Sequence, residues 1–274
     1  MPILLAPMAG ASPASLSIAV ANAGSMGAMG ALLTTPDGIR EWVGAVRAGS
    51  PGPFQLNTWV PDPAPRRDAD AEARVRAFLA QWGPDVPASA GDVTRPGIDE
   101  QCEAFLEARP AAVSSIMGLF APRFVERFKA DGIAWFATAT TLAEATQAEA
   151  AGADAIIAQG FEAGGHRGAF DESRAERQAV GLFALIPRIA DHVGVPIIAT
   201  DFVKAAASAD APPPAPYPVQ RGLTAAMKEA GAAAGDYHRM QVWAGQSAAM
   251  ATQVPAGDLV RRIWEQARAL LGSP

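Results

Sequence analysis

A glycine-rich segment that carries a histidine and an arginine is the densest candidate for chemistry in this sequence. It covers residues 159–168 and reads QGFEAGGHRG, with four glycines within nine residues. Glycines let the backbone approach a planar or anionic ligand closely and leave its N–H groups available as donors. An imidazole titrates near pH ~6.5, so His166 can take or give a proton at neutral pH. We predict His166 as a catalytic and substrate-binding residue and Arg167 beside it as an anion-binding residue.

Three further side chains lie at or just after the ends of predicted strands. Asn57 and Gln159 carry amides, which offer both a donor and an acceptor and suit a flat heterocycle such as a flavin or a nucleobase. Met8 follows Pro7, where its thioether could line a pocket. The alternative for the two amides is a role in capping loops. The alternative for His166 and Arg167 is an ordinary solvated loop, but a position after a strand favours function.

Short apolar runs alternate with helical patterns as far as residue 200. The strands are predicted at 3–6, 27–32, 54–60, 112–117, 133–138, 155–159 and 195–200. The helical patterns lie near 12–23, 35–46, 75–82, 98–106, 122–128, 141–152 and 177–192. Apolar strands separated by helices indicate a parallel sheet buried on both faces. Seven such units favour a TIM (β/α)8-type barrel, whose active site lies at the carboxyl ends of the strands.

The eighth βα unit of such a barrel is not recognisable. We predict a barrel domain over 1–200, a proline-rich linker or junction over 201–218, and a C-terminal helical segment over 219–274 that packs on the barrel. A barrel left open would expose two parallel edges, which proteins normally avoid. We therefore expect that a stretch near Thr200–Asp201 is missing, or that another element closes the edge.

Composition excludes several classes of protein. The 274 residues carry 22 basic and 28 acidic side chains, a net charge of −6, so binding to nucleic acid is not expected. Half the residues are hydrophobic, which argues against disorder. The single cysteine, Cys102, excludes an internal disulfide and fits a reducing compartment, so we expect a cytoplasmic protein. Asp171 and Glu172 lack a second histidine at ligand spacing, so no metal site is predicted.

The N-terminus is uncharged, and the common nucleotide-binding and catalytic motifs are absent from the sequence. The first 36 residues contain no Asp, Glu, Lys or Arg. Prolines and glycines interrupt them and no basic region precedes them, so we expect neither a signal peptide nor a membrane span. The sequence also lacks the dinucleotide fingerprint, the P-loop, HExxH and GxSxG.

The motifs resemble those of the bacterial nitronate monooxygenases. The resemblance covers most of the chain and rests on APMAG at 6–10, on Asn57 and on the segment 159–168; Tyr217-Pro218 and WAGQ at 243–246 are similar to the family's C-terminal segment. It implies an FMN-binding TIM barrel that oxidises alkyl nitronates with O2 to carbonyl compounds and nitrite or related nitrogen oxides. The residues implied to bind FMN are Met8, Asn57, Gln159, Gly164 and Gly165.

The resemblance also implies a role for His166 and leaves alternatives. His166 would bind the nitronate or abstract the α-proton of a neutral nitroalkane. In the family, strand seven is followed by a Gly-Gly pair, a helix and an eighth strand that ends in a Gly-Thr pair, which binds the FMN phosphate. This sequence lacks these elements. One alternative is an FMN-dependent enoyl-thioester reductase, whose similar loop usually lacks an arginine at the position of Arg167. The other is a cofactor-free barrel that acts as a binding protein. The oligomeric state stays open.

Overall fold

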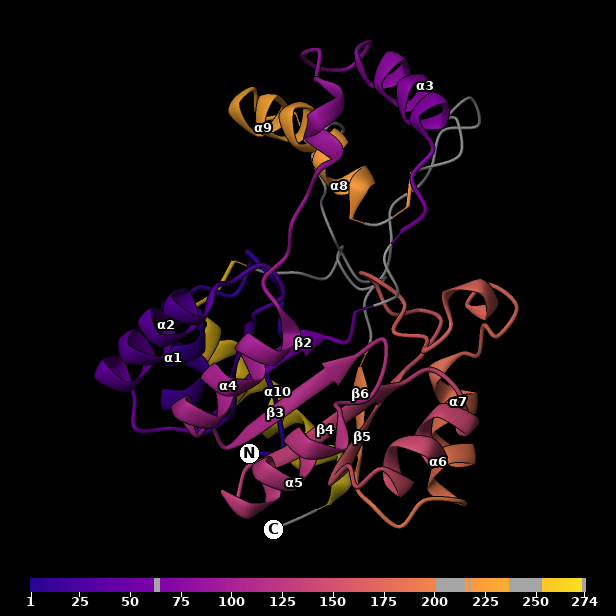
Figure 1. The fold of residues 1–274 in the computed structure, drawn as a ribbon. Coiled ribbons are helices and arrows are strands. Elements are labelled where there is room, and N and C mark those ends of the chain that lie inside the picture. The colour runs from indigo at the N-terminus through magenta and orange to yellow at the C-terminus, as the bar shows by residue number, and fades with distance from the viewer. Residues whose placement is uncertain (62–64, 201–214, 217, 237–252, 273–274) are drawn as a thin grey trace.

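Six parallel strands form one curled sheet in the order of the sequence. The computed structural model in Figure 1 describes residues 1–61, 65–200, 215–216, 218–236 and 253–272. The strands are β1 Gly27–Gly30, β2 Phe54–Trp59, β3 Ala112–Ile116, β4 Ala134–Ala139, β5 Ala155–Gln159 and β6 Ile197–Thr200. Each pairs in parallel with the next, so all carboxyl ends meet at one end of the sheet. The predicted TIM-type α/β architecture is confirmed.

The N-terminal run differs from the prediction. Residues 3–6 were expected to form a full strand, but the structure has an isolated parallel bridge between Leu4 and Met26. Leu5 N–H donates to the Met26 carbonyl and Met26 N–H to the Ile3 carbonyl. Pro2 and Pro7 flank this run and have no N–H to give to a ladder, which limits its pairing. The described residues contain no strand after β6.

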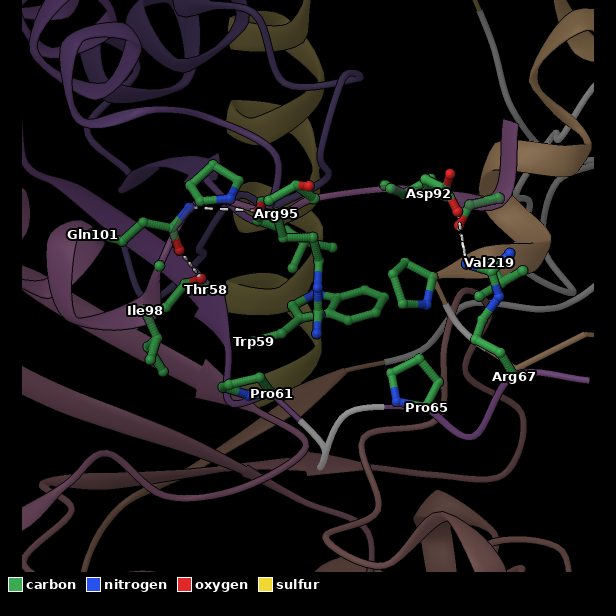
Figure 2. A pocket seen from close by; sticks show the side chains of 17 residues that line it. Thr58, Trp59, Pro61, Pro65, Arg67, Asp92, Arg95, Ile98, Gln101 and Val219 are labelled. Atoms are coloured by element: carbon green, nitrogen blue, oxygen red, sulfur yellow. Dashed lines mark hydrogen bonds and ion pairs between the residues drawn. The ribbon is translucent and has the colours of Figure 1, made fainter. Parts of the chain in front are cut away.

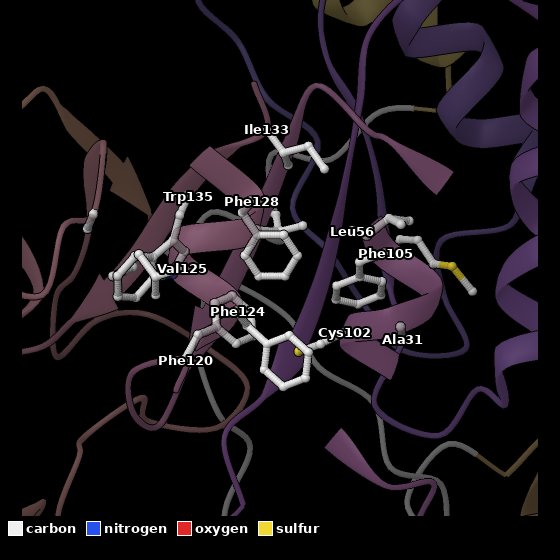
Figure 3. Packing of buried hydrophobic residues seen from close by; sticks show 14 of the residues in the cluster. Ala31, Leu56, Cys102, Phe105, Phe120, Phe124, Val125, Phe128, Ile133 and Trp135 are labelled. Atoms are coloured by element: carbon white, nitrogen blue, oxygen red, sulfur yellow. The ribbon is translucent and has the colours of Figure 1, made fainter. Parts of the chain in front are cut away.

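Helices cover the outer face of the sheet. They are α1 Ala14–Asn22, α2 Pro36–Gly49, α4 Ile98–Ala108, α5 Pro122–Ala130, α6 Leu142–Ala150 and α7 Leu182–Ala190. Helix α10, Ala256–Leu271, packs against α1. The largest hydrophobic cluster lies between these helices and the sheet, where Phe105, Phe128 and Trp135 are fully buried (Figure 3). This burial is the main stabilising contribution of the fold.

Two helix starts show how local sequence sets the element boundaries. The predicted capping box of α6 is present, because Thr141 accepts from the Glu144 N–H and Glu144 accepts from the Thr141 N–H. Helix α7 was predicted to begin near 177 but begins at Leu182. Both carboxylate oxygens of Glu162 accept from the Leu182 N–H, at 2.8 and 2.9 Å. A negative group at a helix N-terminus is favourable, so this contact marks the true start.

A separate lobe, here named the cap, consists of α3, η1, α8 and α9. Their bounds are α3 Ala69–Leu79, η1 Ala88–Gly91, α8 Val219–Leu223 and α9 Ala225–Ala233. In Figure 1 the cap stands at the top of the molecule, away from the sheet. It has its own small core, in which Val75 and Leu79 pack with Val219 and Leu223. Of the segment 219–274, α8 therefore belongs to the cap while α10 lies on the barrel; most of the predicted linker, 201–214 and Tyr217, lies outside the described residues.

Among the described residues, no helix is both long enough and apolar enough to cross a membrane.

Candidate functional site

The carboxyl ends of β1, β2 and β3 lie side by side, and two of the predicted residues, Met8 and Asn57, lie at this end of the sheet. Gly30 of β1 pairs in register with Asn57 of β2, and Asn57 pairs with Ser114 of β3. A Cβ on Gly30 would lie only 2.6 Å from the Ala9 nitrogen and 3.0 Å from the Met8 carbonyl carbon, so only glycine allows this approach. The half-buried Met8 thus lies at the same end of the sheet as Asn57, as the sequence predicted.

Asn57 is buried, and its orientation is set by β3. Its Nδ2 donates to the Ser114 carbonyl at 3.2 Å and lies 3.0 Å from the Ser114 Oγ. Its amide oxygen accepts no hydrogen bond from the described part of the chain. The Asn57 side chain therefore offers a fixed acceptor at the strand end.

Gln159, at the end of β5, holds the histidine segment with both ends of its amide. Its Nε2 donates to the His166 carbonyl at 2.9 Å, and its Oε1 accepts from the Gly168 N–H at 2.6 Å. The side chain is buried. The amide predicted to contact a cofactor is thus bonded to the backbone on both sides of Arg167.

The rest of the histidine segment is anchored to its surroundings by backbone contacts. Phe161 N–H donates to the Val180 carbonyl at 2.8 Å, next to the Glu162 contact that begins α7. A Cβ on Gly160 would lie 2.3 Å from a Glu162 oxygen, and one on Gly168 would lie 2.8 Å from Ile116. Glycine is therefore needed at both ends of the segment for close packing. Gly164 is buried, and Gly165 has a φ of +74° with nothing within 4 Å of a Cβ, so its backbone faces open space.

Glu144 joins the start of α6 to Phe170, just after the histidine segment. One carboxylate oxygen accepts from the Thr140 N–H at 2.7 Å and from its hydroxyl at 2.8 Å; the other accepts from the Phe170 N–H at 3.0 Å. Glu144 is buried. A buried carboxylate needs such partners, because an unsatisfied charge away from water is costly.

The guanidinium of Arg167 contacts backbone carbonyls of the protein. Its Nη2 donates to the Gln178 carbonyl at 2.7 Å and lies 3.5 Å from the Thr140 carbonyl. Burial lowers the pKa of the guanidinium and the nearby Glu144 opposes this. Its buried Nε has no partner among the described residues. Contact with a substrate anion stays a prediction, while the loop contacts are a second role that the sequence did not indicate.

The ring of His166 lies against Trp59. The two ring centroids are 4.5 Å apart, with an angle of 63° between the planes, which is an edge-to-face arrangement. Trp59 is the last residue of β2 and was not among the predicted site residues. It follows Asn57 by two positions, and residues two apart on a strand point to the same face. That spacing is the signal that could have found it.

A cavity of about 620 Å³ opens between the end of β2 and the cap, with Trp59 in its wall (Figure 2). Thr58 donates to Gln101 of α4 at 2.5 Å, and the Gln101 amide donates to the Ala31 carbonyl at 2.7 Å. On the cap side, Arg67 forms ion pairs with Glu72 and Asp92. These contacts give the cavity one wall from the barrel and one from the cap.

No group of three or more His, Cys, Asp or Glu side chains suited to a metal ion occurs within the described residues.

Comparisons with known proteins decide the family. The sequence model of the family described as nitronate monooxygenase matches residues 1–211. The nitronate monooxygenase of Paraburkholderia phytofirmans is 31% identical over 334 residues, which covers 96% of this chain and 91% of the relative. This chain belongs to the nitronate monooxygenase family. The family is flavin-dependent in general.

Other comparisons agree with this family. The nitronate monooxygenase of Pseudomonas aeruginosa is 30% identical over 97% of this chain and 96% of its own. A nitroalkane oxidase from Streptomyces ansochromogenes has a TM-score of 0.82 at 28% identity and covers 99% of this chain and 97% of that one. FabK (M276A) from Thermotoga maritima, with a TM-score of 0.64 and 20% identity over 100% of this chain and 96% of that one, shares the fold alone.

The alignments also bear on the missing eighth unit. The alignments with the Paraburkholderia and Pseudomonas relatives are 334 and 338 positions long, yet they include only 96% and 97% of the 274 residues of this chain. About 70 aligned positions of each relative therefore have no counterpart here. The family match ends at residue 211, shortly after β6. Relatives of this family therefore contain residues that this chain lacks within the aligned span. Tyr217 and residues 243–246, which resemble the family's C-terminal segment, lie outside the described residues.

Proposed function

We propose that this chain oxidises alkyl nitronates with O2 to carbonyl compounds and nitrite or related nitrogen oxides, with FMN as its cofactor. The observation that carries the proposal is the placement of His166. Gln159 holds its backbone at the end of β5 and Trp59 packs against its ring, within a chain of the nitronate monooxygenase family. The carboxyl ends of barrel strands are where this fold builds its active sites.

The described residues fit the ring system of a flavin. Asn57 offers an amide oxygen whose direction is set by the two Ser114 contacts, and an acceptor of this kind suits a ring N–H. Gly165 leaves open space beside its backbone, where a planar group can approach. When bound, the flavin supplies the electron transfer and the reaction with O2. Residues 201–214, which follow β6 where the family has its phosphate site, lie outside the described residues.

The chain's own contribution is to bind and orient the substrate. A protonated His166 stabilises the negative charge of a nitronate, whereas a neutral His166 can take the α-proton of a nitroalkane. Either role needs the ring in a constant position. The hydrogen bond from Gln159 fixes the backbone of His166, and the contact with Trp59 limits the rotation of the imidazole ring.

Oxygen uptake and flavin absorbance test the proposal together. We expect the purified chain, supplied with FMN, to consume O2 and release nitrite when ethyl nitronate is added. His166→Asn should lower this activity, and the matched control His192→Asn should not, because His192 is exposed at the end of α7. NADH oxidation with an enoyl thioester but no O2 uptake with the nitronate would overturn the proposal. Failure to bind FMN at all would instead favour a binding protein.

A further inference from the structure

Trp59 stands between the histidine and the cavity under the cap. The ring centroids of Trp59 and His166 are 4.5 Å apart, and Trp59 also lines the 620 Å³ cavity. Figure 2 shows the indole projecting into the middle of that cavity. The described lining includes Trp59 and not His166. The indole thus lies between His166 and the cavity.

The cavity has apolar contacts on both of its sides, beside polar ones from Thr94, Arg95 and Gln101. Pro61 and Ile98 line it near the barrel, and Pro65 and Val219 line it near the cap. The guanidinium of Arg67 also reaches it but is paired with Glu72 at 2.5 Å and with Asp92 at 2.9 Å. Its charge is therefore balanced within the cap. The apolar part of these walls can hold an alkyl chain.

We propose that Trp59 determines the length of alkyl chain that the site accepts. The inference rests on the proposed function: the charged head of a nitronate lies at His166, and its chain points toward the indole. A short chain ends against Trp59. A longer chain must pass the edge of the indole to reach the cavity, so removal of the indole opens the way from His166 to the cavity and lets the chain bury more methylene groups. Each buried methylene group raises the binding affinity about fourfold.

The first experiment compares substrate length in wild type and variants. Initial rates of O2 uptake are measured for linear nitronates from ethyl to hexyl with Trp59→Ala and Trp59→Leu. We expect the ratio of kcat/KM for hexyl over ethyl nitronate to rise at least about tenfold in both variants, since four more methylenes gain contact. Trp82→Ala is the control, because it removes another indole that is half exposed and does not line the cavity. Its ratio should equal that of the wild type.

A binding experiment separates this inference from the proposed function. Straight-chain carboxylates carry a planar anionic group on an alkyl chain, and the enzyme does not oxidise them. Acetate and hexanoate are therefore titrated into wild type and Trp59→Leu by calorimetry. We expect the affinity ratio of hexanoate to acetate to rise in the variant. An unchanged ratio, an equal loss at every chain length, or no binding of either carboxylate to either protein would overturn the role of Trp59. If wild type binds carboxylates in this way but oxidises no nitronate, the proposed function fails and the chain-length role stands.

Discussion

The side chain of Gln159 holds the backbone of His166: its Nε2 donates to the His166 carbonyl at 2.9 Å, while its Oε1 accepts from the Gly168 N–H at 2.6 Å. These bonds join the end of β5 to the segment that follows it. A small error in the position of a reacting group lowers its rate steeply. Gln159 is therefore expected to act as a positioning residue for His166.

Gln159→Glu tests this positioning role. The variant keeps an acceptor for the Gly168 N–H but replaces the donor to His166 with a carboxylate oxygen, which repels the carbonyl. We expect kcat with ethyl nitronate to fall about ten- to hundredfold and the Kd for FMN, measured by fluorescence quenching, to change little. A large rise in that Kd with kcat preserved would show a direct cofactor contact instead.

His166→Asn separates the two roles of the histidine. Asparagine can donate a hydrogen bond to an anion but cannot take a proton, and general base catalysis contributes about 10²–10⁴-fold. We expect turnover of neutral nitroethane to fall by that order and turnover of ethyl nitronate to fall much less, as measured by O2 uptake. Equal losses on both substrates would argue against a base.

Arg167→Lys tests the structural role of the guanidinium. Lysine cannot reproduce the planar fork that meets the Gln178 and Thr140 carbonyls. Hydrogen bonds from charged groups contribute about 1.5–3 kcal/mol, so we expect a Tm several degrees lower by calorimetry. Arg174→Lys, at an exposed position nearby, is the control. A raised KM for nitronate with an unchanged Tm would point to substrate contact alone.

The cap should lose stability in acid because of the pair between Arg67 and Glu72. Arg67 lowers the pKa of the Glu72 carboxyl below its ordinary value through a hydrogen bond and its charge. A group with a lowered folded-state pKa contributes stability above its unfolded pKa and loses it as the pH falls through the folded pKa. We therefore expect Arg67→Met to lower Tm at pH 7 and the difference from wild type to shrink as the pH falls below about 4. A constant difference across that range would contradict this linkage.

Local sequence determined most of the element order. Apolar runs and helix caps predicted β1 to β6, and the Thr141–Glu144 spacing predicted the start of α6. These features depend on neighbours a few residues apart, so composition and periodicity carry them. The APMAG run and the segment 159–168 likewise sufficed to predict the family that the comparisons show.

Tertiary structure alone decided which residues meet. Trp59 contacts His166 across 107 positions of sequence, and the cap core joins Val75 to Val219. The Gln159 amide could cap a loop or face a ligand as far as its sequence context showed, and the folded chain shows its bonds to the backbone of the loop. Such contacts depend on how distant segments pack around one core, and no local pattern encodes that packing. The sequence by itself thus determined the family and the strand ends, whereas the folded chain decided what each side chain at those ends touches.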